Sequence, residues 1–317
     1  NLMKKLKVAF VKFGGMALGG TEKVLQNIAC HLPKDKFQVD FYYCDAAPYI
    51  GSDFKHIDTE PSRVKYCQDN DVNLIKFKVG AKDITTPTHD WVNTDFWQVF
   101  DENSYDLVVT GRAGHSEYPF CMMSQVPIVD TIHLAGMAEN KPNTYKTVLI
   151  SEEQRERWVS AGGNREKSMI IANPVFCPKT NAKFDYPKKF VFGLHQRPDD
   201  GIFSDLLEIH KFLNTLNVYA HGRSDGEQCS TAIIEAMSHG IPIVSHFAPS
   251  NGHVEQISDT GIVVNDSSEY ASSLQKMMED HKYYDECVAK TKNRYEQQYS
   301  LDAIINKYAT LFMEVIR

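Results

Sequence analysis

The 317-residue sequence contains no apolar run that approaches the ~18 residues needed to cross a membrane as a helix. It contains no low-complexity tract and no internal repeat, which excludes fibrous and solenoid architectures. Basic residues are not in excess, because 34 Lys and Arg stand against 41 Asp and Glu and the net charge is −7. An extended nucleic-acid surface usually needs a basic footprint, so we expect no nucleic-acid partner.

The seven cysteines are scattered, and no two of them form a Cys-x-x-Cys pair. This spacing suits neither a disulfide framework nor a zinc site, and it is typical of reduced, mostly buried thiols in a cytosolic protein. Residues 1–6 lead into a strand-like run rather than into the apolar core of a signal peptide. We therefore expect a cytoplasmic protein. Peripheral contact with a membrane and the oligomeric state stay open.

What the sequence does contain is enough apolar material for two cores, with 42% hydrophobic and 24% charged residues. Strand-like runs alternate with helical or irregular segments, which predicts an α/β fold with doubly wound, mainly parallel sheets. Ligands of such sheets gather at the carboxyl ends of the strands. In the first half, the strand-like runs are residues 7–11, 37–43, 73–77, 106–110, 126–132 and 147–150.

A glycine-containing loop, residues 14–20, follows the first strand and precedes a helix that begins near Thr21. Glycine has no side chain, so Gly19 and Gly20 would let a ligand phosphate or sugar approach the backbone. The loop is not a P-loop, because Gly20 stands where the lysine is required, and there is no Gly-x-Gly-x-x-Gly. A tight structural turn would explain the same residues.

A second helix is predicted from Ser230 or Thr231, which can cap it, to its stop at Gly240. It is apolar on every side, and residues 241–244 after it read as an interior strand, so the helix is expected to be buried. Glu235 lies in its middle. An ionised carboxylate is costly to bury, so Glu235 has either a fixed protein partner or a polar ligand.

The residues around this helix resemble the donor-site signature of retaining glycosyltransferases with the GT-B fold, of the family-4 type. The matching pattern is Gly226-Glu227, seven intervening residues, then Glu235-Ala236-Met237 and the Gly-x-Pro-Ile-Val run at 240–244. The spacing from Glu255 to Gly261 and the glycine pair at the start of the first helix are also similar to that family. The resemblance implies two Rossmann-like doubly wound parallel-sheet domains facing a cleft.

The resemblance also implies roles for individual residues. Glu227 contacts hydroxyls of the transferred sugar, and Glu235 holds the nucleotide ribose. The backbone N–H groups of Cys229, Ser230 and Thr231, at the start of the helix, face the diphosphate, as the helix dipole favours. The alternative for single residues is that Glu227 is a solvated loop residue and that Glu235 pairs with a core Arg or His.

His133 follows the predicted strand 126–132 directly, so its imidazole is expected at the ligand edge of the sheet. In the resembling family a histidine after this strand approaches the donor sugar, and the resemblance assigns that role to His133. A structural hydrogen bond is the alternative. His115, in another loop, is a weaker candidate.

Arg197 is the candidate cation for the donor phosphates. It lies where the resembling family has an Arg and, a few residues later, a Lys that bind the diphosphate. Leu194 stands where that Arg is usual, and no Lys occurs between Arg197 and Lys211. The alternative for Arg197 is a surface salt bridge with Asp199 or Asp200, whose charges would repel a diphosphate unless they point away.

The domain boundary is predicted at Asn173-Pro174 and the polar run that follows. This gives residues 1–175 as an N-terminal Rossmann-like domain on the acceptor side and 176–300 as the donor-side domain. Residues 301–317 form a helix that crosses back to the first domain or caps the second sheet. Strand-like runs near residues 190, 218, 243 and 262 give the second domain about four strands, so it is either shortened or lacks a segment.

The resemblance implies a metal-independent hexosyltransferase of glycan or surface-polysaccharide synthesis that retains the anomeric configuration. The expected donor is a nucleotide-sugar, with a UDP-sugar favoured over a GDP-sugar, and no further cofactor or metal is expected. The acceptor is a hydroxyl of a sugar, a lipid-linked molecule or another compound. The alternatives are a nucleotide-sugar epimerase of the same fold and a non-catalytic nucleotide-sugar-binding or scaffold relative.

Overall fold

The computed structural model describes residues 4–45, 58–80, 94–112, 123–133, 138, 141–178, 191–193 and 206–316. The chain divides into two compact units. Unit 1 comprises Asn1–Ile150, Gln154–Ile171 and Ile305–Arg317, and unit 2 comprises Ser151–Glu153 and Ala172–Ile304. The sequence predicts boundaries after residues 175 and 300, whereas the structure divides the chain after Ile171 and after Ile304 and groups residues 151–153 with unit 2.

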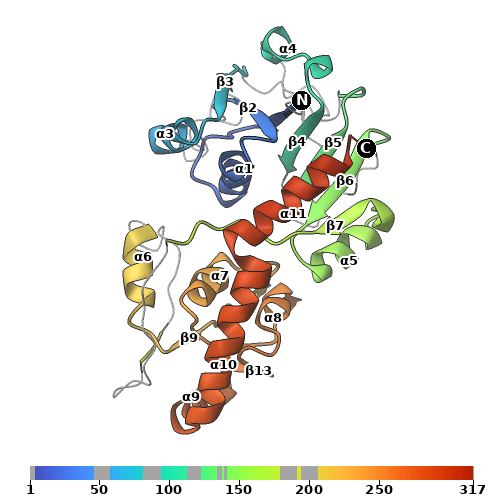
Figure 1. Cartoon of the computed structure of the whole chain (residues 1–317). Coiled ribbons are helices and arrows are strands. Elements are labelled where there is room, and N and C mark those ends of the chain that lie inside the picture. Colours follow the sequence, from blue (N-terminus) through green and yellow to red (C-terminus); the bar gives the residue numbers. More distant parts are fainter. Residues whose placement is uncertain are drawn as a thin grey trace. The chain divides into compact units, whose positions relative to one another are not determined.

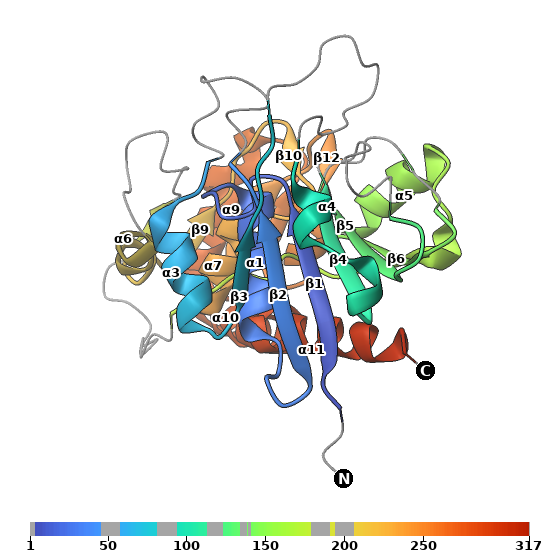
Figure 2. The same cartoon turned by 90° about the horizontal axis from the view of Figure 1, so that it is seen from above.

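Unit 1 is built on a seven-stranded parallel sheet with the strand order β3-β2-β1-β4-β5-β6-β7. Its central strands run side by side (Figure 2), and they are mostly buried, with apolar residues such as Val8, Phe10 and Val108 at 0% exposure. The strands are β1 Leu6–Lys12, β2 Phe37–Tyr43, β3 Asn73–Lys76, β4 Leu107–Arg112, β5 Ile128–Ile132, β6 Thr144–Leu149 and β7 Ser168–Ile170.

The strand order reverses between β1 and β4, which pair side by side although they are far apart in the chain. This reversal is the topological switch point of a Rossmann-like sheet, outside which ligands bind at the carboxyl ends of the strands. β1 ends there at Lys12, and β5 ends at Ile132, one residue before His133. The topology therefore brings the glycine loop and His133 to the same edge of the sheet.

Helices cover both faces of this sheet (Figure 1). α1, Gly20–His31, buries the predicted apolar face formed by Val24, Leu25, Ile28 and Ala29. The helices are α1, α3 Pro61–Asp69, α4 Phe96–Val99 and α5 Glu152–Ser160. The later part of α11, Leu301–Glu314, also belongs to this unit, where the Phe312 ring packs 6.5 Å from Phe10 and 6.2 Å from Phe37 between ring centroids.

Unit 2 has a four-stranded parallel sheet with the order β13-β11-β9-β8, as the runs near residues 190, 218, 243 and 262 predict. Two further strands form a separate short parallel pair, β10 with β12. The strands are β8 Phe192–Gly193, β9 Val218–Ala220, β10 Gly226–Glu227, β11 Ile243–His246, β12 Ser250–Asn251 and β13 Ile262–Val264.

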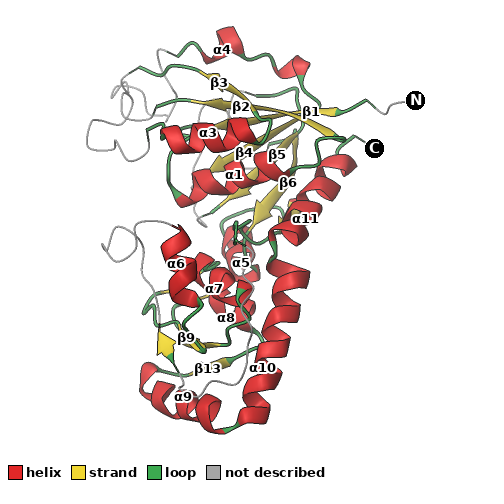
Figure 3. Cartoon of the chain, turned by 60° about the vertical axis from the view of Figure 1, so that its left-hand side comes forward, coloured by secondary structure: helices red, strands yellow, loops and turns green. Residues whose placement is uncertain are grey.

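The helices of unit 2 surround these short strands (Figure 3). They are α6 Leu206–Leu213, α7 Thr231–Ser238, α8 Gly252–Ile257, α9 Tyr270–Glu279 and α10 His281–Arg294. α10 is α-helical to Arg294 and continues as a π-helical turn, Tyr295–Tyr299. Within the described ranges of both units, no helix is long and apolar enough to cross a membrane.

Candidate functional site

The start of α7 is fixed by two side chains. The Ser230 Oγ caps the helix by accepting the N–H of Ile233 at 3.3 Å, an interaction that contributes about 1 kcal/mol at such positions. Gln256 of α8 accepts the Ser230 N–H at 2.7 Å and donates to the Ser230 carbonyl at 3.1 Å. The Ser230 N–H, expected to face a diphosphate, is therefore already bonded to protein.

The N–H groups of Thr231 and Ala232 come next in the first turn of α7, where a helix has no internal acceptor for them. Among the residues that the structure describes, neither group has an acceptor. The positive end of the helix dipole lies at the same place. The sequence predicts the N–H groups of Cys229, Ser230 and Thr231 as donors to a diphosphate, and of these the Thr231 N–H is one without a protein acceptor in the described part of the chain. The Ala232 N–H is a further donor, which the sequence analysis missed.

Glu227 closes the short strand β10, just before this helix, and its side chain is 21% exposed. Its Oε1 lies 3.5 Å from Arg223 Nη1 and 3.6 Å from His221 Nε2. Burial by itself raises the pKa of Glu227, but contacts with His221 and Ser230 and the charge of Arg223 outweigh it, so the pKa lies below its ordinary value. Glu227 is therefore a carboxylate at neutral pH.

The expected neighbour Glu235 lies in the second turn of α7 and is 8% exposed. Burial raises the pKa of the Cys177 thiol to about 12, and the negative charge of Glu235 contributes to this rise. Cys229, on the loop before α7, is likewise a protonated thiol, because burial raises its pKa to about 12. Neither cysteine is a nucleophile in this state, since the reactive form is the thiolate.

His221 is a site residue to which the sequence analysis gave no role. It follows β9 directly and is 5% exposed, with Nδ1 3.0 Å from the Oγ of Ser245. The ring of His253 in α8 lies against it, tilted by 39°, at 5.1 Å between ring centroids. The signal that could have found His221 is its place, because a polar residue at the carboxyl end of a buried strand lies at the ligand edge of the sheet.

A buried ion pair marks the ligand edge of unit 1. Lys12, the last residue of β1, has its Nζ 3.5 Å from the Oε1 of Glu22 in α1, and both side chains are at most 10% exposed. The Glu22 carboxylate passes so close to Gly19 that a Cβ there would lie 1.9 Å from Oε2, whereas a Cβ at Gly20 would meet open space. A side chain at position 19 would therefore have to displace the Glu22 carboxylate, which explains why a glycine fits there.

The glycine loop itself is held by the buried side chain of Gln26 in α1. Its Nε2 donates to the carbonyls of Gly15 at 2.9 Å and Ala17 at 3.0 Å, and its Oε1 accepts from Arg63 Nε at 2.6 Å. Two backbone acceptors and one charged donor thus satisfy one amide side chain. The loop after β1 is consequently fixed in position at the switch point.

His133 lies at this edge, immediately after β5. Its Nε2 is buried and has no hydrogen-bond partner within the described part of the chain. Burial, with a contribution from the charge of Lys12, lowers the pKa of His133 to about 3. The ring is therefore neutral at physiological pH.

The neutral state of His133 predicts a pH dependence of stability. Its pKa is about 3 in the folded chain and about 6.5 when unfolded, so the unfolded chain binds the extra proton as the pH falls below about 6.5. Between about pH 7 and about pH 5, the free energy of unfolding should fall by roughly 1 to 2 kcal/mol through this group. Urea denaturation at both pH values should show that His133→Gln loses less of its free energy of unfolding than wild type does. The control His281→Gln, at an exposed position, should lose as much as wild type. Equal losses in all three chains would contradict this account of His133.

The predicted residues fall into two sets. Unit 2 brings together Glu227, Cys229, Ser230, Thr231 and Glu235 around the start of α7. Unit 1 brings Gly19, Gly20 and His133 to the carboxyl edge of its sheet. Arg197, Leu194 and His115 lie outside the described residues.

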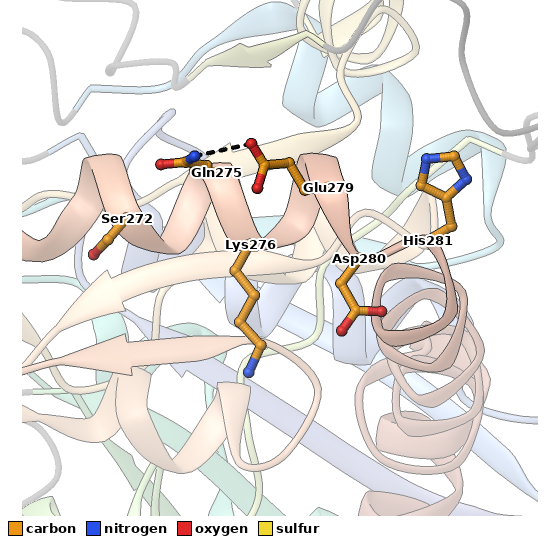
Figure 4. Close-up of a pocket in the computed structure, with 6 residues that line it drawn as sticks. All are labelled: Ser272, Gln275, Lys276, Glu279, Asp280 and His281. Atoms are coloured by element: carbon orange, nitrogen blue, oxygen red, sulfur yellow. Dashed lines mark hydrogen bonds between the residues drawn. The ribbon is translucent and has the colours of Figure 1, made fainter.

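An open hollow on the surface of unit 2 lies apart from these residues (Figure 4). It is lined by Ser272, Gln275, Lys276, Glu279, Asp280 and His281. Gln275 donates to Glu279 at 2.8 Å, Lys276 lies 4.0 Å from the Tyr283 ring centroid, and Asp280 caps α10. These polar groups therefore already have partners within the protein. Across the described ranges, no group of three His, Cys, Asp or Glu residues could hold a metal ion.

Solved structures resemble this chain over nearly its whole length. HepE from Anabaena, in complex with UDP and glucose, superposes with a TM-score of 0.64 at 14% identity, covering 98% of this chain and 100% of HepE. A glycosyltransferase from Rickettsia africae gives 0.70 at 13% identity, covering 99% of each chain. A sucrose-phosphate synthase from Thermosynechococcus elongatus superposes with a TM-score of 0.64 at 14% identity, covering 98% of this chain and 99% of the synthase. The chain has the GT-B fold.

This result confirms the fold predicted from the sequence. A family model described as Glycosyl transferases group 1 matches residues 203–294, which is less than half of the chain. The matched segment lies in unit 2 and contains His221, Glu227 and the whole of α7. No curated protein sequence gave a significant match.

Proposed function

We propose that this chain is a glycosyltransferase that moves a sugar from a nucleoside-diphosphate sugar to a hydroxyl acceptor with retention of configuration. The observation that carries the proposal is the start of α7. An ionised Glu227 precedes a helix whose Thr231 and Ala232 N–H groups have no acceptor among the described residues, and Glu235 lies on the same helix. The segment that matches the Glycosyl transferases group 1 model contains all of these residues.

The chemistry fits these groups. In the transfer, the bond between the sugar C1 and the donor phosphate oxygen breaks and its electron pair stays on that oxygen. A bond from C1 to the acceptor oxygen forms, and the proton of the acceptor hydroxyl passes to the released diphosphate or to water. The leaving nucleoside diphosphate gains negative charge, which the free N–H groups and dipole of α7 stabilise. The Glu227 carboxylate accepts hydrogen bonds from sugar hydroxyls, and Glu235 accepts from the ribose. These groups need no metal, and the donor is the sole cofactor-like ligand of the proposal.

The proposed donor is a UDP-sugar. HepE, which shares the fold, has been solved with UDP, with UDP and glucose, and with UDP-glucose. A sugar, lipid-linked or other hydroxyl is the proposed acceptor, in the synthesis of a glycan such as a surface polysaccharide. In unit 1, neutral His133 would bond a hydroxyl of the donor sugar, with the loop at Gly19 and Gly20 beside it. In unit 2, Arg197 is the proposed cation for the phosphates.

Calorimetric titration with UDP and GDP tests the nucleotide site. We expect wild-type protein to bind UDP more tightly than GDP, and Glu235→Ala to weaken UDP binding about tenfold or more, because a buried hydroxyl acceptor is lost. Glu286→Ala is the matched control, since Glu286 is also helical but exposed on α10. Folded wild-type protein that binds neither nucleotide would overturn the proposal.

Product analysis tests the reaction itself. Wild-type protein should release UDP from a UDP-sugar faster when an acceptor is present, and NMR should show the same anomeric configuration in donor and product. EDTA should leave the rate unchanged. Interconversion of the donor sugar without an acceptor would indicate an epimerase instead. Tight UDP binding with no turnover of any donor would indicate a binding protein.

A further inference from the structure

His221 is held by its backbone on both sides. Its N–H donates to the carbonyl of Val244 in β11 at 2.8 Å, and its carbonyl accepts the hydroxyl of Tyr270 in α9. The residue is 5% exposed. The sheet and α9 therefore fix where the imidazole stands, and solvent has little influence on its orientation.

The two ring nitrogens of His221 face different partners. Nδ1 lies 3.0 Å from the hydroxyl oxygen of fully buried Ser245. Nε2 is buried and has no hydrogen-bond partner among the described residues, but Oε1 of Glu227 lies 3.6 Å away, which is within ion-pair distance and slightly longer than a hydrogen bond. When Ser245 donates to Nδ1, the ring proton is on Nε2 and points at the carboxylate. The other neutral tautomer would direct the Nε2 lone pair at a negative oxygen, which is repulsive. The imidazolium also presents Nε2–H, so both favoured states direct a donor at Glu227.

The other groups around His221 do not replace this donor. His253 of α8 packs at 5.1 Å, and burial lowers its pKa, so the ring is neutral. Its Nε2 bonds the His246 carbonyl at 2.8 Å, and its contact with Glu227 is with the backbone of that residue and not with the carboxylate. Arg223 contacts Glu227 at 3.5 Å, but its side chain is 43% exposed and also binds Asp225 at 2.8 Å. Arg223 adds charge from a partly exposed position, whereas the buried groups that contact Glu227 are His221 and the capping Ser230, which is 1% exposed.

We propose that His221 is a positioning residue for the transfer, whose Nε2–H holds one oxygen of the Glu227 carboxylate so that the other oxygen meets a hydroxyl of the donor sugar. The inference rests on the proposed function, because it concerns the same site. Ser245 fits both favoured states of His221, because its hydroxyl can donate to a neutral Nδ1 or accept from Nδ1–H. The three side chains Ser245, His221 and Glu227 thus form a line of contacts, which presents a carboxylate of fixed direction at the start of α7.

Kinetics separate positioning from mere packing. His221→Leu should lower kcat/KM for the UDP-sugar that wild type uses best, among UDP-glucose, UDP-galactose and UDP-N-acetylglucosamine, by about tenfold to a hundredfold. Its affinity for UDP alone should stay at the wild-type value, because Glu227 acts on the sugar. His221→Gln, whose amide N–H can reach the same oxygen, should recover most of the rate. His281→Leu, an exposed histidine, is the control.

A titration that needs no substrate tests the contact directly. The carboxyl resonance of Glu227, assigned with Glu227→Gln, can be followed against pH by carbon-13 NMR. In His221→Leu the pKa of Glu227 should rise towards its ordinary value, because one of the groups that lower it is gone. Ser245→Ala keeps the ring in place and should raise the pKa of Glu227 by a smaller amount. This variant replaces His221→Leu in the titration if His221→Leu does not fold.

The outcomes distinguish the two proposals. Wild-type protein that binds no UDP and turns over no UDP-sugar would end the proposed function, while the NMR titration would still report on His221 and Glu227. An active wild type whose His221→Leu variant keeps both the turnover and the Glu227 titration would overturn the role of His221 alone. A rate loss in His221→Leu that His221→Gln shares fully would also overturn it, because packing would then explain the effect.

Discussion

Replacing Glu227 by Gln should lower kcat/KM for transfer by about a hundredfold to a thousandfold while the chain stays folded. The amide has nearly the shape of the carboxylate, but it lacks the negative charge that His221 and Arg223 stabilise in the folded protein. It can accept fewer hydrogen bonds from sugar hydroxyls, and its NH₂ group faces the donors of His221 and Arg223. Steady-state UDP release, measured with and without an acceptor, checks the result.

The comparison needs a folding control and a charge control. Circular dichroism should show that Glu227→Gln keeps wild-type secondary structure, and Glu227→Ala should lose at least as much activity as Glu227→Gln. Glu286→Gln removes the same charge from an exposed position of α10 and should keep wild-type turnover. Full activity in both Glu227 variants would show that the site is assigned to the wrong carboxylate.

Replacing Gly226 by Ala should destabilise the protein strongly, by about 3 to 5 kcal/mol. Gly226 has a φ of +73°, which L side chains rarely adopt, and an added Cβ would lie 1.7 Å from the backbone carbonyl oxygen of Ser250 in the paired strand β12. The backbone of β12 would have to move. Since the same pairing holds Glu227, activity should fall together with stability.

Gly222→Ala is the matched control for Gly226→Ala. An added Cβ at Gly222 would meet only the Tyr270 ring, with its nearest atom at 3.9 Å, which is ordinary contact. In urea denaturation, the free energy of unfolding of Gly222→Ala should be close to that of wild type, and that of Gly226→Ala should be far lower. A loss under about 1 kcal/mol for Gly226→Ala would mean that β10 and β12 pair less tightly than the structure shows.

The sequence by itself determined most of the architecture. The alternation of apolar strand-like runs and amphipathic helices predicted both parallel sheets, and the four runs of the second half correspond to the four strands β8, β9, β11 and β13. The helix from Ser230, with its cap and its stop at Gly240, was also readable. These features follow from local chemistry, because burial periodicity, caps and left-handed glycines depend on neighbours in the chain.

The polar partners of the site were decided by the tertiary structure. Gln256 reaches the start of α7 from another helix, His221 meets Glu227 and Ser245 from separate strands, and Lys12 pairs with Glu22 across the glycine loop. A hydrogen bond between distant residues leaves no periodic trace in a sequence, since any of many polar residues could supply it. The strand order, which makes β9 and β11 neighbours, brings His221 and Ser245 within contact distance.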